Sequence, residues 1–208
     1  MGLIANALTR LATSHFNYWF GFMVDAAVAV SFWMFALRYV RGTWATCISV
    51  VLAGLSLYGL MEYLFHRWIY HGERSPAATG HLMHHKDPQA LIGLPFFSPA
   101  TVGFVLWFLL RRILGEGWAS LMMAAVATNF LYYGLLHHTH HHGRLKGGFF
   151  QRMRRYHLIH HHFPDRNFGV TMTLWDWVFG THYLSAKRSC IAGPPDGVRP
   201  NVRRAWPE

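Results

Sequence analysis

The stretch WASLMMAAVATNFLYYGLLHHTHH, residues 118–141, joins the two features that decide the fold, an uncharged apolar run and a cluster of histidines. The run from Trp118 to Leu136 is close to the roughly 20 helical residues that cross a hydrocarbon core of about 30 Å. His137 and His141 follow it four residues apart, a spacing that places both imidazoles on one helix face. The stretch therefore predicts a transmembrane helix that carries metal-ligating side chains where it leaves the membrane.

Three further apolar runs are similar, so the sequence predicts an all-α integral membrane protein with four transmembrane helices. The spans are expected at residues 19–37, 44–65, 95–110 and 118–136, and the third is expected to stop at Arg111 and Arg112. The composition agrees, because 13% of the residues are charged, against about a quarter in soluble domains. At 208 residues the chain is expected to form a single domain, residues 1–208.

The connections between the runs predict the topology. The links at 38–43 and 111–117 are short enough for antiparallel helical hairpins. The long polar segments 66–94 and 137–183, expected to be the catalytic segments, then fall on one membrane face. Their basic residues favour the cytoplasmic face, which also accounts for the formal net charge of +10. No nucleic-acid partner is expected.

The remaining segments add expectations about redox state and order. Cys47 lies in an apolar run and Cys190 in the tail, so we expect no disulfide and a reducing compartment. The N-terminus lacks the pattern of a cleavable signal peptide. The amphipathic stretch Leu174–Phe179 is expected to dock against the helical core or the membrane interface. The Pro-, Gly- and Arg-rich tail, 184–208, is expected to be poorly ordered.

The sixteen histidines are concentrated in clusters beside the predicted helix ends. Ten stand at ligand spacing, and we predict that these bind metal: His66, His71, His81, His84, His85, His137, His141, His157, His160 and His161. Positions three or four apart share a helix face. Two clusters therefore each place three imidazoles on one face, able to bind one ion or to bridge toward a second: His81, His84 and His85, and His157, His160 and His161. His66 and His71 are five apart, which turns past one face, so His71 is expected where the helix ends. Ten imidazoles exceed the ligands of one octahedral ion, and two ions are the economical number.

The metal and the other histidines follow from the same chemistry. Imidazole suits zinc, copper, iron and nickel, and the clusters contain no thiolate of the kind found in structural zinc sites. Oxygen chemistry at a membrane surface needs a redox metal, so we predict two iron ions, with zinc as a competitor in purified samples. His15 and His182 are expected to be ordinary interfacial residues. The others orient ligands or have no role: His138, His140, His142 and His162.

Four stretches resemble the histidine boxes of the fatty acid hydroxylase family, within the sterol desaturase and hydroxylase superfamily. In chain order they are EYLFHRWIYH (62–71), HLMHHKDP (81–88), YGLLHHTHHHG (133–143) and YHLIHH (156–161), followed by FGVT (168–171) and LWD (174–176). The resemblance implies a membrane enzyme with a cytosolic dimetal site above four transmembrane helices. It assigns the same ten histidines as metal ligands.

The resemblance also implies an activity. Members of the family insert one oxygen atom from O2 at carbon 2 of a fatty acyl chain, often one carried by a sphingolipid, so we expect a lipid acyl substrate. Its chain is expected in a cleft lined by residues such as Phe96, Phe97 and Leu135. Many members carry an N-terminal haem domain as electron donor, for which this chain has no room, so a separate cytochrome, ferredoxin or reductase is expected. Gly134 stands where members often carry an acid, which leaves the substrate head group open.

Two alternatives stay open. The first is the same dimetal oxygenase chemistry on a sterol, a carotenoid or another lipid. The second is a metal-binding membrane protein without redox chemistry, such as a transporter. Transporters place polar ligands near the bilayer midplane, whereas these spans contain only Asp25 and Glu62 as acids and the histidines stand outside them. The compact chain favours a bacterial inner membrane, or the endoplasmic reticulum in a eukaryote.

Overall fold

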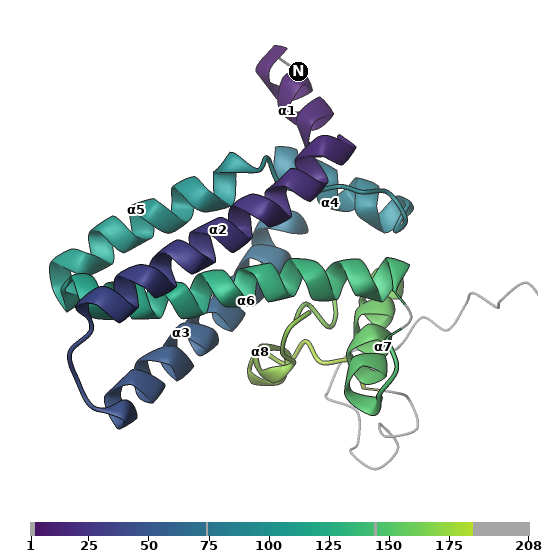
Figure 1. The fold of residues 1–208 in the computed structure, drawn as a ribbon. Coiled ribbons are helices and arrows are strands. Elements are labelled where there is room, and N and C mark those ends of the chain that lie inside the picture. Colours follow the sequence, from purple (N-terminus) through teal and green to yellow (C-terminus); the bar gives the residue numbers. More distant parts are fainter. Residues whose placement is uncertain (1–2, 74, 144, 185–208) are drawn as a thin grey trace, which may run out of the picture.

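The computed structural model describes residues 3–73, 75–143 and 145–184, and every regular element in these ranges is helical (Figure 1). In chain order the helices are α1 (Leu3–Ala12), α2 (His15–Tyr39), α3 (Trp44–Leu64), η1 (Phe65–Tyr70), α4 (Pro76–Lys86), α5 (Phe97–Leu114), α6 (Glu116–His142), α7 (Gly148–His162) and α8 (Leu174–Val178). Four of them, α2, α3, α5 and α6, are long and extend away from the region of α4 and α7. The predicted all-α fold is confirmed.

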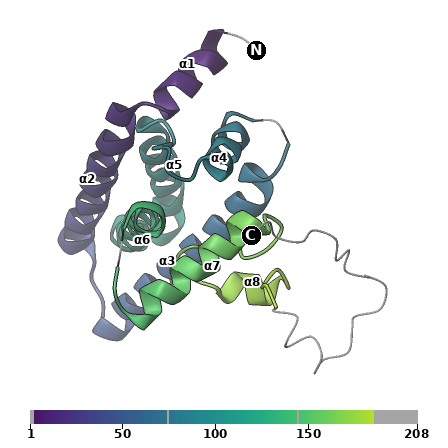
Figure 2. The same ribbon diagram turned by 90° about the vertical axis from the view of Figure 1, so that its right-hand side faces the viewer.

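Helix α6 forms the centre of the bundle and packs against α2, α3 and α5. Small side chains allow this close approach, since Ala124 and Ala125 are at most 1% exposed. Phe32 of α2 and Tyr58 of α3 pack with Met123 of α6 in the buried core. Figure 2, in which α6 is seen nearly end-on, shows the other long helices arranged around it.

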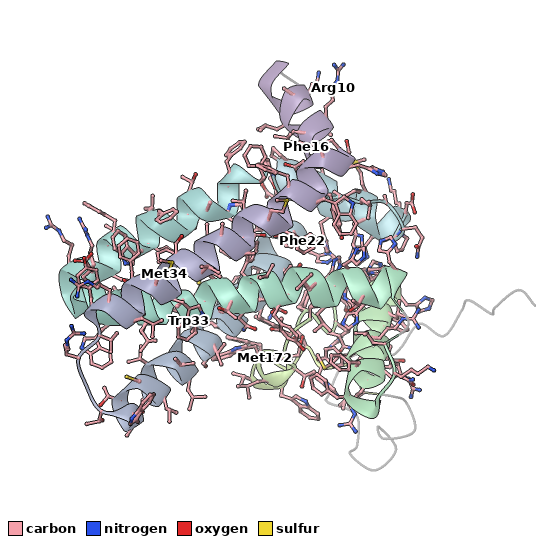
Figure 3. The ribbon with its side chains drawn as sticks, viewed as in Figure 1. Arg10, Phe16, Phe22, Trp33, Met34 and Met172 are labelled. Carbon is pink, nitrogen blue, oxygen red and sulfur yellow. The ribbon has the colours of Figure 1, made fainter. Side chains whose placement is uncertain are left out.

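Four helical stretches are long and apolar enough to cross a membrane: His15–Tyr39, Trp44–Tyr70, Phe97–Leu114 and Glu116–His142. Their outer surfaces expose large apolar side chains, such as Met34 and Leu37 of α2, which are 66% and 80% exposed (Figure 3). Helix α5 has no buried residue at all. Surfaces of this kind are stable in lipid and unfavourable in water. The chain is an integral membrane protein with four spans, as predicted.

The third span is longer than the sequence predicted. We expected Arg111 and Arg112 to end it, but α5 continues to Leu114. The guanidinium of Arg111 lies 4.6 Å from the ring centroid of Phe108, and cations near a helix C-terminus interact favourably with the helix dipole. Gly115 then adopts a φ of 79° and α6 begins at the next residue, so the hairpin is as tight as predicted.

The second span ends in a π-helical turn, η1, whose winding decides where its histidines point. The N–H of His71 donates to the carbonyl of His66, five residues earlier, at 3.2 Å. A helix wound in this way brings positions five apart onto one side, which an α-helix does not. The two rings lie 5.3 Å apart between centroids. The prediction that this spacing turns past one face was therefore wrong, although His71 does stand at the helix end.

The shorter helices gather at the histidine-bearing end of the molecule. Helix α7 lies across this end in Figure 2, and α8 contacts α3. The ring of Phe179, just after α8, stacks on Tyr63 of α3 at 4.9 Å between centroids, so this amphipathic stretch docks on the helical core. Helix α1 was not anticipated from the sequence and projects from the bundle (Figure 1). The predicted disorder of the tail beyond Leu184, together with Cys190, lies outside the described residues.

Candidate metal centre

The ten predicted histidines converge at one end of the bundle in two groups of five. The first group contains His66, His71, His81, His85 and His160, and the second contains His84, His137, His141, His157 and His161. Within each group, one ring nitrogen from each histidine lies within 4.8 Å of the others. The structure thus brings together all ten side chains that the sequence singled out.

Neighbouring histidines on one helix are divided between the groups. On α4, His84 belongs to the second group and His85 to the first. On α7, His160 belongs to the first group and His161 to the second. The rings of His85 and His161 stack with centroids 4.3 Å apart, so the two groups adjoin. Helices α4 and α7 therefore bridge both groups, one of the two arrangements that the spacing allowed.

The Nε2 atoms of the first group lie close to one another, but too few of them carry a hydrogen for each close pair to form a hydrogen bond. Nδ1 of His66 donates to the carbonyl of Phe168, and Nδ1 of His160 donates to the carbonyl of Arg166. A neutral imidazole carries one N–H, so Nε2 of both rings presents a lone pair. Nε2 of His160 nevertheless lies 3.1 Å from Nε2 of His71. Converging lone pairs repel unless a cation lies among them, so the residues present fit a metal ion.

Burial makes these imidazoles poor bases. Burial first, and then neighbouring imidazoles, lowers the pKa of His84 to about 2 and the pKa of His161 to about 3. Burial likewise lowers the pKa of His85 to about 4 and the pKa of His160 to about 3. The rings are therefore neutral at pH 7, which is the form in which histidine binds metal ions.

The loop 168–171 orients the first group. The carbonyl of its first residue, Phe168, accepts the Nδ1 hydrogen of His66. Asp176 is fully buried and accepts hydrogen bonds from the N–H groups of Phe168 and Gly169, both at 2.8 Å. Asp176 thereby fixes the carbonyl that sets the tautomer of His66, as outer partners of metal-ligating histidines do.

Glu62 holds the other end of the same loop. Its carboxylate accepts hydrogen bonds from the N–H groups of Val170 and Thr171 and from the hydroxyl of Thr171. Glu62 is buried and lies four residues before His66 on the same continuous helix. The second span therefore carries both a histidine of the first group and the carboxylate that anchors the loop behind it.

The second group is held by packing rather than by backbone carbonyls. Nε2 of His157 lies 2.8 Å from Nε2 of His141 and 3.1 Å from Nε2 of His161, so nitrogens converge here as well. The buried Nδ1 atoms of His157 and His161 have no hydrogen-bond partner among the described residues. The ring of Tyr133 stacks on His137 with centroids 5.9 Å apart. This geometry also fits a metal ion, although fewer hydrogen bonds fix the orientation of these rings than in the first group.

The other histidines are not members of either group: His15, His138, His140, His142, His162 and His182. The hydroxyl of Tyr18 pairs with Nδ1 of His138 at 2.9 Å. The buried ring of His140 stacks near His157, 5.5 Å between centroids. His138 and His140 thus contact the surroundings of the second group without joining it.

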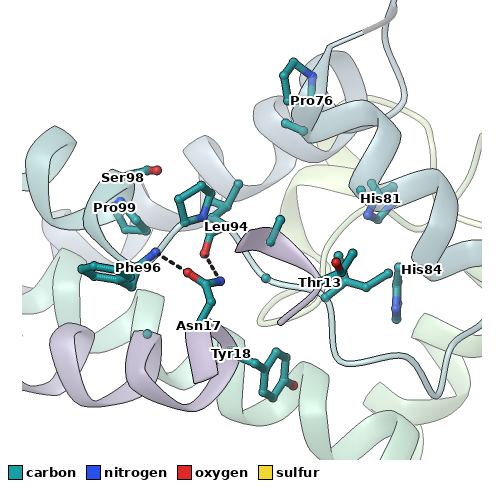
Figure 4. Close-up of a pocket in the computed structure, with 18 of the residues that line it drawn as sticks. Thr13, Asn17, Tyr18, Pro76, His81, His84, Leu94, Phe96, Ser98 and Pro99 are labelled. Atoms are coloured by element: carbon teal, nitrogen blue, oxygen red, sulfur yellow. Dashed lines mark hydrogen bonds between the residues drawn. The ribbon is translucent and has the colours of Figure 1, made fainter. Parts of the chain in front are cut away.

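A cavity of about 530 Å³ adjoins both groups. Helices α2 and α4 and the segment 92–99 contribute to its walls, and His81, His84 and His137 stand in them. Figure 4 shows His81 and His84 at one side of this cavity and Asn17 at the other. Histidines of both groups are therefore accessible from the same cavity.

Asn17 of α2 ties the far wall of this cavity together. Its side-chain amide donates to the carbonyl of Leu94 and its side-chain oxygen accepts from the N–H of Phe96, each at 2.9 Å (Figure 4). Phe96 and Phe97 line the cavity, as predicted from the sequence.

Leu135 does not line the cavity, so that part of the prediction was wrong. Consecutive residues point about 100° apart on a helix, so Leu135 points away from the cavity that its neighbour lines, and its side chain is 47% exposed. The neighbouring Gly134 lines the cavity instead. A Cβ at Gly134 would stand 2.8 Å from Cε1 of Phe22, so an acid at this position requires Phe22 to move.

A second cavity, of about 320 Å³, extends between α2, α3, α5 and α6 into the membrane-spanning part. Its lining is mostly apolar and includes Phe32, Leu106 and Met123. Several residues line both cavities, and we call them the junction: Asp25, Tyr70, Leu94, Ser98, Pro99, Phe130 and Tyr133. An elongated lipid with one polar end fits such a pair of spaces.

Comparison with known families supports the same assignment. The family model described as "Fatty acid hydroxylase" matches residues 51–181, a range that covers well over half of the chain and contains all ten histidines. The chain belongs to the fatty acid hydroxylase family. Members of this family are lipid-hydroxylating oxidoreductases, in agreement with the resemblance of the four histidine boxes.

Individual members of the fatty acid hydroxylase family match over about two thirds of the chain. Identity is 33% over 141 residues with the dihydroceramide fatty acyl 2-hydroxylase FAH2 of Arabidopsis thaliana, and 30% over 149 residues with the fatty acid 2-hydroxylase of Rattus norvegicus. The chain covers 60% of the plant protein and 39% of the rat protein. It is similar in structure to full-length scs7p, of which only the hydroxylase domain is visible. The TM-score is 0.70 at 24% identity, over 84% of this chain and 69% of that one, which supports the fold.

Two residues that shape the site were not recognised as functional from the sequence. Glu62 carried a usable signal, since an acid inside an apolar helix is costly unless it has a partner or a role. Asp176 belongs to the stretch LWD (174–176) that carries part of the family resemblance, but nothing in that stretch indicates a role for the carboxylate. Its role becomes visible only when the loop 168–171 lies against His66.

Proposed function

We propose that this chain is an O2-dependent hydroxylase of lipid acyl chains whose ten histidines hold two iron ions, one in each group of five. The observation that carries the proposal is the position of two groups of converging, neutral imidazoles in the wall of a membrane cavity. His81, His84 and His137 face that cavity directly.

The reaction divides between the metal and the protein. Two bound iron ions would supply the activation of dioxygen that attack on an unactivated C–H bond requires, because no side chain is a strong enough oxidant. The carbonyls of Phe168 and Arg166 hold His66 and His160 as Nδ1–H tautomers, so that Nε2 is free to bind metal. The apolar second cavity holds the acyl chain and excludes water from it.

Fatty acyl 2-hydroxylation is the reaction that we propose. Relatives of the chain carry this activity in their names, and the two cavities are consistent with it. A lipid whose acyl chain fills the second cavity has its first carbons at the junction. There, Tyr70 stacks on His81 at 5.2 Å and Tyr133 stacks on His137 at 5.9 Å between centroids. Carbon 2 adjoins the head group and so lies beside both histidine groups.

Electrons for this reaction are proposed to come from a separate cytochrome, ferredoxin or reductase. The histidine groups lie at the ends of the membrane-spanning helices, and α7, which carries three of these histidines, also carries the exposed Arg152 and Arg155. The positive-inside bias favours the cytoplasm for a basic face, and we propose that the histidine groups lie on that side. A bacterial inner membrane, or the endoplasmic reticulum in a eukaryotic host, is the proposed location.

Lipid mass spectrometry on cells that express the wild type or His160→Ala tests the proposed function. Under heavy dioxygen, the wild type should produce an acyl lipid with one added labelled oxygen, and the variant should not. If a sterol or carotenoid carried the label in place of an acyl lipid, the substrate would belong to that class instead. Unchanged lipids alongside bound metal would favour a protein that handles metal without redox chemistry.

A further inference from the structure

Asp25 places a carboxyl group inside the membrane-spanning bundle. It lies in the middle of α2, is half-buried, and lines both cavities at the junction. It makes no hydrogen bond or ion pair with any residue in the described part of the chain. An ionisable residue at membrane depth is costly, and such residues in membrane proteins serve ligands, ions or protons.

Three phenol groups face the same space without hydrogen-bond partners. Tyr58, Tyr70 and Tyr133 line the second cavity, and none of their hydroxyls bonds to another described residue. Tyr58 is only 6% exposed. Buried polar groups in folded proteins are nearly always paired, and leaving them unpaired costs free energy. Asp25 and these hydroxyls are therefore suited to a ligand that brings its own hydrogen-bonding groups.

The position of these groups fits the polar end of a lipid. Tyr70 and Tyr133 stack on histidines of the first and second group respectively, as described above. Beyond them the second cavity is lined mainly by apolar side chains suited to a hydrocarbon chain. Asp25, Tyr70 and Tyr133 thus stand at the junction, where head group and chain of a bound lipid meet, and Tyr58 lies beyond them in the second cavity.

We propose that Asp25 determines substrate selectivity by accepting a hydrogen bond from the group that joins the acyl chain to the rest of the lipid. A carboxyl group accepts hydrogen bonds, and in its ionised form it repels another carboxylate. The preferred substrate therefore carries an N–H or O–H donor beside the chain, as an N-acylated lipid does, and a free fatty acid is disfavoured. This inference rests on the proposed hydroxylase function. Asp25 lies outside residues 51–181, so the family match does not assign it.

Two variants separate the hydrogen bond from the charge. Asp25→Asn keeps an acceptor oxygen and removes the charge, whereas Asp25→Leu removes both at similar size. Because Asp25 bonds to no other described residue, neither change breaks an internal hydrogen bond. Removal of an unpaired carboxyl from a membrane cavity should leave the melting temperature equal or higher. Ser31→Ala, at a partly exposed position of the same helix, is the matched control.

The experiment compares purified, metal-loaded proteins, supplied with O2 and a chemical reductant in place of the separate electron donor. The two substrates are an N-acyl amide lipid and the free fatty acid of equal chain length, with binding and turnover measured separately. For Asp25→Leu we expect about a tenfold loss of affinity for the N-acyl lipid, the usual scale for a hydrogen bond to a charged group. Asp25→Asn should keep most of that affinity and accept the free acid better. Selectivity and affinity unchanged in Asp25→Leu would overturn the inference. A wild type that hydroxylates neither lipid would instead overturn the proposed function, and the binding data would still decide the role of Asp25.

Discussion

The two five-histidine groups differ in what holds their rings in place. In the first group, backbone carbonyls fix His66 and His160 through Nδ1, and buried carboxylates hold the loop that supplies one of those carbonyls. In the second group, Nδ1 of His157 and of His161 has no partner among the described residues, and packing alone orients these rings. The first site is thus constrained from outside, whereas the second has more freedom. We expect the second to exchange its metal more readily, since outer partners strengthen metal binding.

His160→Ala and His161→Ala give the sharpest test of this difference, because the two residues are adjacent on α7 but belong to different groups. Each should lose hydroxylase activity by more than about 100-fold, beyond the 10–100-fold effect of removing an outer partner. Each should also lose about one of two metal ions by elemental analysis. Arg155→Ala, exposed on the same helix, should keep both ions. Loss of both ions from either histidine variant would show that the groups are not separate.

Asp176→Ala should damage the first group and the fold together. The N–H groups of Phe168 and Gly169 and the hydroxyl of Thr181 all donate to Asp176, and the change leaves them without this acceptor. Buried unsatisfied donors cost about 1–3 kcal/mol each, so a loss of about 3 kcal/mol or more is expected. Thermal unfolding in detergent should shift by roughly 10 °C. An unchanged melting temperature would contradict the role given to this carboxylate.

Glu62→Gln should act on the first group with a smaller effect. Glutamine keeps one acceptor oxygen but cannot accept from both the backbone and the hydroxyl of Thr171 as the carboxylate does. Affinity for one of the two ions should fall about tenfold, measured by competition with a chelator. Glu73→Gln, at an exposed position, is the control and should bind both ions normally. If both ions bound more weakly by the same factor, the loop 168–171 would not act on the first group alone.

Acid should destabilise the metal-free protein through both groups. The folded pKa is about 4 for His85 and about 3 for His161, against about 6.5 in the unfolded chain. Because the unfolded state binds more protons, stability is full above about pH 6.5 and falls as the pH drops toward 4. Melting temperatures of chelator-treated protein at pH 7 and pH 5 measure this effect. Equal values at both pH values would show that the imidazoles are not buried as neutral rings.

The spans and the ten histidines were predictable because each depends on local sequence. Apolar length identifies a membrane helix, and intervals of three or four place residues such as His137 and His141 on one face. The end of α5 was missed because Arg111 lies over aromatic rings of the same helix, a contact that hydropathy does not express.

The division of the histidines into two groups was not predictable from spacing. His84 and His85 are adjacent in sequence, but His84 is grouped with histidines of α6 and His85 with the histidines at η1. The side-by-side placement of His66 and His71 depends on a π-helical turn, which the sequence did not reveal. The role of Asp176 depends on a loop folding back onto α3, and such long-range contacts leave no periodic pattern.

Anomalous diffraction at the iron edge, on crystals of protein purified from iron-fed cells, tests the central claim most directly. The account predicts two peaks, one among His66, His71, His81, His85 and His160 and the other among His84, His137, His141, His157 and His161. A single peak shared by both groups, or peaks away from these ten histidines, would contradict it.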